Sequence, residues 1–295
     1  MPEGVQLWND RPYETIRVNR IAGALGAEIE GADLRKPLTD ALYGEIYQAF
    51  LESQVIFFRD QDLTPAEFLA FAKRWGDIHL HPYMTGLDDY PEVLELVKTE
   101  TDTYAFGSSW HSDQMFAPKP AKCTMLLARE IPPAGGDTMF ADMYGAYDAL
   151  SDGMKAMLAP IKALNSGDKK RAGGGSSRAE RYSGAQKMKL KDPGPIQTDS
   201  VHPIVRTHPD TGRKGLYLGS HTQHLDGLTV EESAPILSYL RTHCRRPELT
   251  CRFRWQPASL AIWDNRCVQH YAINDYQGYR RRMHRITIKG EDAPF

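Results

Sequence analysis

The stretch that decides the fold is SLAIWDNRCVQHYAINDYQGYRRRMHRITIKG, residues 259–290. Its two ends, SLAIWDN and HRITIKG, are short apolar runs typical of buried strands, and His270 lies between them. TCRFRW just before it, and AKCTMLLARE and DTMFADM earlier in the chain, have the same character. Many short strands in the C-terminal two thirds, with helices outside them, predict a mainly β protein with a sandwich or barrel core.

Four other segments have helical patterns. Residues 38–53, 146–158 and 229–244 carry apolar side chains at helical spacing. The fourth helix begins at Thr64, where Glu67 three residues later completes a capping box. These helices are expected to flank the β core.

The bulk composition is that of an ordinary globular protein. The chain has 295 residues, of which 41% are hydrophobic and 25% charged, and its net charge is -2. This balance argues against a general nucleic-acid partner or an acidic membrane surface. The longest apolar runs are far shorter than the roughly 20 residues that span a bilayer. The start, MPEGVQLWND, lacks a secretory signal pattern, and the four scattered cysteines include no CxxC, so reduced thiols and a cytoplasmic location are expected.

We expect a single catalytic domain over residues 1–295. Residues 165–200 differ from the rest because they are rich in glycine and basic and polar side chains, as in NSGDKKRAGGGSSRAERYSG. The GGG run lacks the spacing of a phosphate-binding loop. We interpret this segment as a mobile, lid-like surface loop.

The chain contains the pattern His-x-Asp three times, at His111, His208 and His224. On a strand, residues two apart point to the same side, so such a pair can offer an imidazole and a carboxylate to one ion. The pair at His208 lies at the tip of an expected hairpin that turns at 210–212, and the pair at His224 runs into a glycine turn. His111 and Asp113, in WHSDQMF, are flanked by apolar residues and followed by a strand-rich stretch, so we favour this pair.

A metal site of this kind needs a third ligand from a distant strand, and His270 is the best candidate. Two histidines and one carboxylate leave one face of the ion open, which suits the non-heme Fe(II) oxygenases. Zinc is the rival metal, because the same ligands bind it. The residues alone leave this choice open.

Several motifs together resemble the taurine/2,4-dichlorophenoxyacetate (TauD/TfdA) family of Fe(II)- and 2-oxoglutarate-dependent dioxygenases. They are WHSD, then GGDT followed by Phe140-Ala141-Asp142-Met143, then HPDTGRKGLYLGSH, and finally WDNR, QH and two arginines four apart. They occur in the order of the family, and the similarity extends from about residue 15 to the end. The resemblance implies a double-stranded β-helix core, the cupin-like jelly roll, with flanking helices.

The resemblance also implies roles for seven residues. His111, Asp113 and His270 match the iron ligands. Thr138 and Arg281 match the residues that hold the distal carboxylate of 2-oxoglutarate. Arg285 and His81 match those that bind the anionic group of the substrate.

The residue types agree with these roles. 2-Oxoglutarate is a dianion, and arginine is a rigid two-pronged donor for its far carboxylate. Arg281 and Arg285 are four apart and would lie on one side of an extended strand, where two anionic ligands would balance their charges. The alternative interpretation, without a binding role, is that the run of arginines at 280–285 is a solvated basic patch. His79, His202, His221, His243 and His284 are interpreted as structural.

The implied reaction oxidises 2-oxoglutarate to succinate and CO2 with O2 while hydroxylating a small organic anion. Sulfonates, alkyl sulfates and aryloxyalkanoates all remain open as substrates. Gly107-Ser108-Ser109 stands where the taurine-specific pattern carries an asparagine, which argues against taurine. The competing hypotheses are a non-enzymatic or zinc-bound protein that only binds a small anion, and a zinc hydrolase that uses the same triad. The family often forms oligomers, so a homo-oligomer, dimer or tetramer, is expected.

Overall fold

The computed structural model describes residues 13–82, 84–103, 106–167 and 197–295. Its centre is a seven-stranded sheet in which β2 and β3 are parallel and all other neighbours antiparallel. The strands, in spatial order, are β1 (Arg17–Arg20), β2 (Ala27–Glu30), β3 (Val55–Phe58), β13 (Leu260–Asp264), β5 (Cys123–Glu130), β15 (Arg281–Ile288) and β4 (Leu94–Lys98). The two ends of the stretch 259–290 therefore become β13 and β15, which flank β5.

A smaller sheet faces the large one. It has the order β12 (Thr250–Phe253), β6 (Thr138–Asp142), β14 (Val268–Ala272) and is antiparallel throughout. One apolar core fills the space between the sheets, and in it Phe57 of the large sheet stacks on Phe253 of the small one with ring centroids 3.9 Å apart. Two sheets closed over such a core form the predicted jelly roll, and the large, interdigitating aromatic side chains hold them together.

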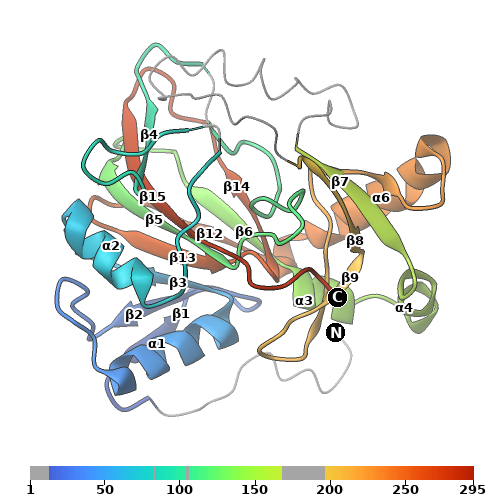
Figure 1. Cartoon of the computed structure of the whole chain (residues 1–295), viewed down its shortest axis with the longest axis horizontal. Coiled ribbons are helices and arrows are strands. Elements are labelled where there is room, and N and C mark those ends of the chain that lie inside the picture. The colour runs from blue at the N-terminus through green and yellow to red at the C-terminus, as the bar shows by residue number, and fades with distance from the viewer. Residues whose placement is uncertain (1–12, 83, 104–105, 168–196) are drawn as a thin grey trace.

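Two helices cover the outer face of the large sheet (Figure 1). They are α1 (Asp40–Ser53) and α2 (Pro65–Lys73), and they bury Phe50 and Phe68 in a second core. The predicted capping box is present at the start of α2, where the Thr64 hydroxyl and the Glu67 backbone and side chain exchange hydrogen bonds. The structure thus confirms both predicted helices.

The remaining elements pack beside the β core around a third apolar cluster (Figure 1). They are α3 (Met143–Asp148), α4 (Asp152–Leu158), β7 (Lys162–Ser166), β8 (Asp199–Pro203), β9 (Val205–Thr207), β10 (Lys214–Leu216), β11 (Thr222–Leu225), α6 (Val230–Cys244) and a 3-10 turn at Pro247–Leu249. Strands β9 and β10 form the predicted hairpin, and Gly212 in its turn has φ 68°.

The prediction of one helix over 146–158 is wrong, because this region forms two helices. Asp142 caps α3 by accepting hydrogen bonds from the backbone of Tyr144 and Gly145. Ser151 caps α4 by accepting from the backbone of Met154, so the chain restarts a helix there. Local caps therefore override the continuous apolar pattern.

Three further expectations concern the chain as a whole. All four cysteines are buried and unpaired, as predicted. Most of the predicted lid-like loop at 165–200 lies outside the described residues. None of the helices in the described part of the chain has the length and apolar character needed to cross a membrane.

Candidate active site

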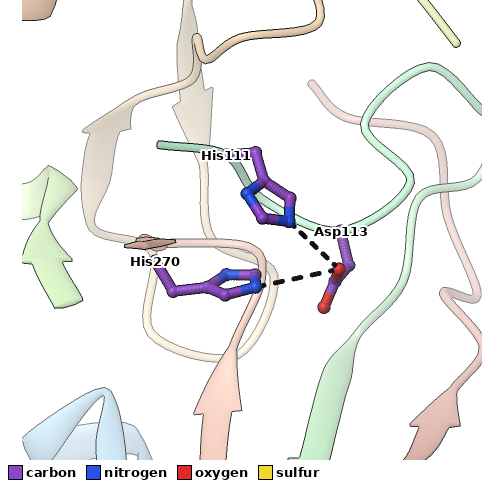
Figure 2. A group of neighbouring side chains, drawn as sticks. All are labelled: His111, Asp113 and His270. Carbon is purple, nitrogen blue, oxygen red and sulfur yellow. Dashed lines mark ion pairs between the residues drawn. The ribbon is translucent and has the colours of Figure 1, made fainter. Parts of the chain in front are cut away.

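The structure brings His111, Asp113 and His270 together. His111 lies beside β14, and its backbone exchanges two hydrogen bonds with His270, at 3.1 and 2.9 Å. The Nε2 atoms of His111 and His270 lie 3.7 and 3.9 Å from Asp113 Oδ1. Figure 2 shows both imidazoles directed at this carboxylate. The predicted convergence of two distant segments on one point is therefore present.

The three side chains fit a divalent metal ion. Their candidate ligand atoms all lie within 4.8 Å of one another, and all three residues are buried. His111 Nδ1 lies 2.6 Å from the carbonyl oxygen of Ser109, which leaves Nε2 for a ligand. Burial, and then the neighbouring His111, lower the pKa of His270 well below its usual value, so this imidazole is neutral and can bind metal.

Asp113 is ionised despite its burial. Burial opposes ionisation, but above all Arg285, together with the Thr124 hydroxyl, holds the pKa of this carboxyl well below its usual range. An ionised carboxylate with two imidazoles is a donor set that suits Fe(II), with zinc as the common rival.

Two supporting residues of Asp113 were not predicted from the sequence. Thr124 Oγ1 donates a 2.6 Å hydrogen bond to Asp113 Oδ2 and accepts one of 3.0 Å from Asn265. Asn265 Oδ1 in turn accepts from the backbone of Asp113 at 3.0 Å and from the indole of Trp263 at 3.1 Å. This network fixes the carboxylate and leaves Oδ1 directed at the histidines. Asn265 lies within the WDNR motif, and this was the only sequence signal that could have pointed to this network.

Arg285 is the counter-ion of Asp113. Its Nη2 lies 2.8 Å from Asp113 Oδ1, and both side chains are only 6% exposed. Its Nε donates to Thr287 Oγ1 at 3.3 Å. Arg285 therefore lies on the inner face of β15, next to the candidate metal ligands, where a substrate anion bound near the metal could reach it.

Arg281 lies on the same strand and meets Thr138 through Trp255. The indole nitrogen of Trp255 donates to Thr138 Oγ1 at 3.0 Å, and the Arg281 guanidinium lies 5.7 Å from a Trp255 ring centroid. Nε and Nη2 of Arg281 are buried and have no hydrogen-bond partner among the described residues. Burial lowers the pKa of Arg281, an effect that Tyr276 and Asp137 oppose. A carboxylate placed here would satisfy the buried N–H groups.

The other two arginines of the run face outward. Arg280 pairs with Glu130 at 2.7 Å, and Arg282 with Glu95 at 3.3 Å, in partly exposed surface bridges. The basic-patch interpretation therefore holds for these two and not for the buried pair. Successive side chains of a strand point to opposite faces, which explains why the two pairs of arginines lie on different sides.

The remaining His-x-Asp pairs have different environments. The pair at His208 lies in the turn between β9 and β10, as predicted, but His208 is buried and its Nε2 lies 3.0 Å from Asp264 Oδ2. The Asp264 carboxylate already accepts two hydrogen bonds from the Arg266 guanidinium, and burial raises the pKa of the adjacent Cys267 well above its usual value. A paired carboxylate beside a protonated thiol is a structural network rather than a metal site. The pair at His224 joins no metal-ligand cluster among the described residues.

His81, the predicted second contact for the substrate anion, is half-buried on the extended segment that follows α2. Its role stays a prediction.

Comparison with known proteins assigns the family. Residues 17–287 match the family described as "Taurine catabolism dioxygenase TauD, TfdA family". The chain belongs to the TauD/TfdA family. The resemblance inferred from the WHSD, GGDT and WDNR motifs is thereby confirmed.

Individual proteins also match nearly the whole chain. An alkylsulfatase of Acinetobacter baylyi is 34% identical over 95% of this chain and 87% of its own. An alpha-ketoglutarate-dependent sulfate ester dioxygenase of Pseudomonas putida is 32% identical over 93% of this chain and 89% of its own. The crystal structure of a taurine dioxygenase from Burkholderia xenovorans superposes with a TM-score of 0.78 and 31% identity, over 95% of this chain and 91% of that one. The jelly-roll prediction is confirmed, and dioxygenase chemistry is favoured over the zinc hydrolase.

Proposed function

We propose that His111, Asp113 and His270 hold the Fe(II) of a 2-oxoglutarate-dependent dioxygenase that hydroxylates a small organic anion. The observation that carries the proposal is the buried convergence of these three side chains beside the buried Arg285 and the buried N–H groups of Arg281. TauD/TfdA membership supports the same reaction class. Bound Fe(II), with 2-oxoglutarate and O2, supplies the oxidising chemistry that converts a substrate C–H bond to C–OH and releases succinate and CO2.

Arg281 and Thr138 would hold the distal carboxylate of 2-oxoglutarate. The Arg281 guanidinium has two buried N–H groups that lack a partner in the described chain, and Trp255 orients the Thr138 hydroxyl. Satisfying buried donors with a carboxylate gives strong, charge-assisted hydrogen bonds. The ligand's other end would then lie towards the metal ligands.

Arg285 and His81 would bind the anionic group of the substrate. Arg285 projects beside Asp113, so an anion bound to it would place neighbouring carbon atoms close to the metal site. The buried surroundings of the triad would keep bulk water from the reacting bond.

We propose alkyl sulfates as the first substrates to test, followed by sulfonates and aryloxyalkanoates. Two relatives are named for sulfate esters. Hydroxylation of the carbon that carries the ester oxygen gives a hemiacetal-like sulfate. Cleavage of its C–O bond to the sulfate then leaves an aldehyde and free sulfate, without a further oxidant.

The test is substrate-dependent formation of succinate from 2-oxoglutarate by the Fe(II) protein, screened across alkyl sulfates, sulfonates and phenoxy acids. The 2-oxoglutarate complex should also give a weak visible charge-transfer band under anaerobic conditions. Folded, iron-loaded protein that gives neither band nor succinate would exclude the oxygenase. Turnover with zinc alone, without 2-oxoglutarate, would favour the hydrolase.

We further propose that the whole chain acts as one catalytic domain, forms a homo-oligomer, dimer or tetramer, and works in the cytoplasm. Light scattering of the purified protein tests the oligomeric state, and cell fractionation tests the location. A monomer at micromolar concentration would contradict the first expectation.

A further inference from the structure

His79 lies on the inner face of the β core, close to Arg285. Ile78 pairs with Ile288, and both pack into the outer core under α1 and α2. The next residue, His79, donates its backbone N–H to Thr287 O at 2.8 Å, so these two residues are also opposite each other. Because successive side chains point to opposite faces of a sheet, His79 and Thr287 both project inward.

The inner neighbours of His79 belong to the substrate side of the site. Thr287 Oγ1 accepts the hydrogen bond from Arg285 Nε at 3.3 Å. Arg285 and Asp113 both act electrostatically on the His79 imidazole. The backbone contact and the charge effects thus place this side chain beside the Arg285–Asp113 pair.

His79 also carries an unused polar atom. Its Nε2 is buried and has no hydrogen-bond partner among the residues that the structure describes. An unpaired buried polar atom is costly, and native proteins rarely leave one without a partner or a ligand. The half-buried ring therefore offers a donor or acceptor at a place where a ligand is expected.

The imidazole is neutral at physiological pH. Burial lowers the pKa of His79 to about 4, with Arg285 and Lys289 acting in the same direction and Asp113 opposing them. A neutral imidazole carries one N–H donor and no charge. Contact with an anion through Nε2 would use the tautomer with the proton on that nitrogen.

We propose that His79 is a further substrate-binding residue, beside Arg285 and the predicted His81, that donates its Nε2–H to an oxygen of the anion held by Arg285. The inference rests on the proposed function. It assigns a role to a histidine that sequence reasoning left as structural.

The proposal also narrows the substrate class. Besides the predicted contact with His81, the anion would meet one guanidinium charge, already shared with Asp113, and the uncharged donor of His79. Such a site suits a singly charged group, such as a sulfate monoester, a sulfonate or a carboxylate. A doubly charged phosphate monoester would leave one negative charge unmatched beside Asp113.

The experiment measures binding of hexyl sulfate to anaerobic Fe(II) protein loaded with 2-oxoglutarate, by calorimetry and without turnover. His79→Phe should raise the Kd for hexyl sulfate about tenfold or more, the effect of losing one hydrogen bond to a charged group. His79→Gln, whose amide nitrogen can replace Nε2, should recover most of the affinity. The Kd for 2-oxoglutarate should change less than about twofold, well below the effect of losing a contact.

The matched control is His284→Phe. His284 precedes Arg285 on β15, points to the opposite face and is more deeply buried than His79, with only 4% of its surface exposed. It should leave the Kd for hexyl sulfate within about twofold of wild type, less than the loss of one hydrogen bond. His79→Leu repeats the test with a smaller apolar side chain should phenylalanine prevent folding.

The outcomes separate the two proposals. If His79→Phe or His79→Leu binds hexyl sulfate like wild type while Arg285→Ala loses it, His79 only packs and the proposed function stands. If wild type binds no alkyl sulfate, sulfonate or phenoxy acid, the proposed function fails and this inference fails with it. If wild type at pH 8 binds hexyl phosphate as tightly as hexyl sulfate, the selectivity for a single charge is refuted.

Discussion

Replacing Arg285 by methionine should destabilise the metal-free protein strongly. The variant keeps an unbranched apolar side chain but removes the charge that lies 2.8 Å from Asp113 Oδ1, in a pair whose side chains are each 6% exposed. Removing one partner of a buried ion pair costs about 3–5 kcal/mol, because the other charge stays in a poorly solvated site. The Thr124 hydrogen bond still supports Asp113, so we expect the lower end, about 3 kcal/mol.

Arg282→Met is the matched control. Arg282 is on the same strand, pairs with Glu95 at 3.3 Å, and both side chains are about one-third exposed, at 31% and 35%. Such a surface pair contributes about 0–1 kcal/mol. Urea unfolding at pH 7 in the presence of EDTA should separate the two variants by about 2 kcal/mol or more. Equal unfolding midpoints and slopes would refute the view that Arg285 compensates a buried Asp113 charge.

A bound divalent metal should restore much of the unfolding free energy that Arg285→Met loses. A bound ion would give Asp113 a new opposing charge, and its binding stabilises the folded state in proportion to the logarithm of metal concentration over Kd. Mn(II), which does not require anaerobic handling, should therefore stabilise Arg285→Met more than wild type. If Mn(II) raises the two stabilities equally, Asp113 does not face the ion.

Three further predictions test other parts of the molecule. Thr124→Val keeps the shape but removes the donor to Asp113, so Mn(II) affinity by calorimetry should fall about 10–100-fold; unchanged affinity would contradict a supporting role. Arg281→Lys loses the two-pronged donor, so the Kd for 2-oxoglutarate should rise about tenfold or more while Mn(II) affinity stays constant; an effect on both would point to misfolding. Burial raises the pKa of Asp142 to about 6, above the value of about 3.9 in the unfolded chain. Between these two pH values the folded protein binds a proton at Asp142 that the unfolded protein does not, so the free energy of unfolding of wild type falls as pH rises from about 4 to 6. Asp142→Asn should remove that slope in urea unfolding, and an unchanged slope would assign it elsewhere.

Much of the fold was predictable because local patterns and long-range packing agree. The capping box at Thr64 and the apolar strand within SLAIWDN required no knowledge of partners. The break between α3 and α4 was missed because Ser151 caps a new helix, and the start of α3 was missed because Asp142 both ends β6 and caps that helix. Apolar periodicity does not reveal such local caps.

The site was predictable only where motifs carried it. His111, Asp113 and His270 were assigned from motif order, and the structure places them together. Thr124 and His79 were missed because their contacts depend on strand register, which pairs residues far apart in sequence. The turn at His208 was predicted correctly, but its contact with Asp264 was missed for the same reason, since Asp264 lies on another strand.

The different surroundings of Arg281 and Arg285 also explain which anion each arginine would bind. Arg281 and Arg285 are four residues apart on one face of β15, so their backbones are about 13 Å apart and their charges repel by roughly 1 kcal/mol at an effective dielectric of about 20. Arg285 already has Asp113 at 2.8 Å, whereas Arg281 rests on an aromatic ring and keeps two buried N–H groups without a partner in the described chain. A free carboxylate would therefore gain more binding free energy at Arg281 than at Arg285. A dianion of the length of 2-oxoglutarate, anchored there, would extend its second end towards the triad, and Arg285 would be left for a different, singly charged molecule. Because the two arginines have different partners, one strand can bind two different anions selectively.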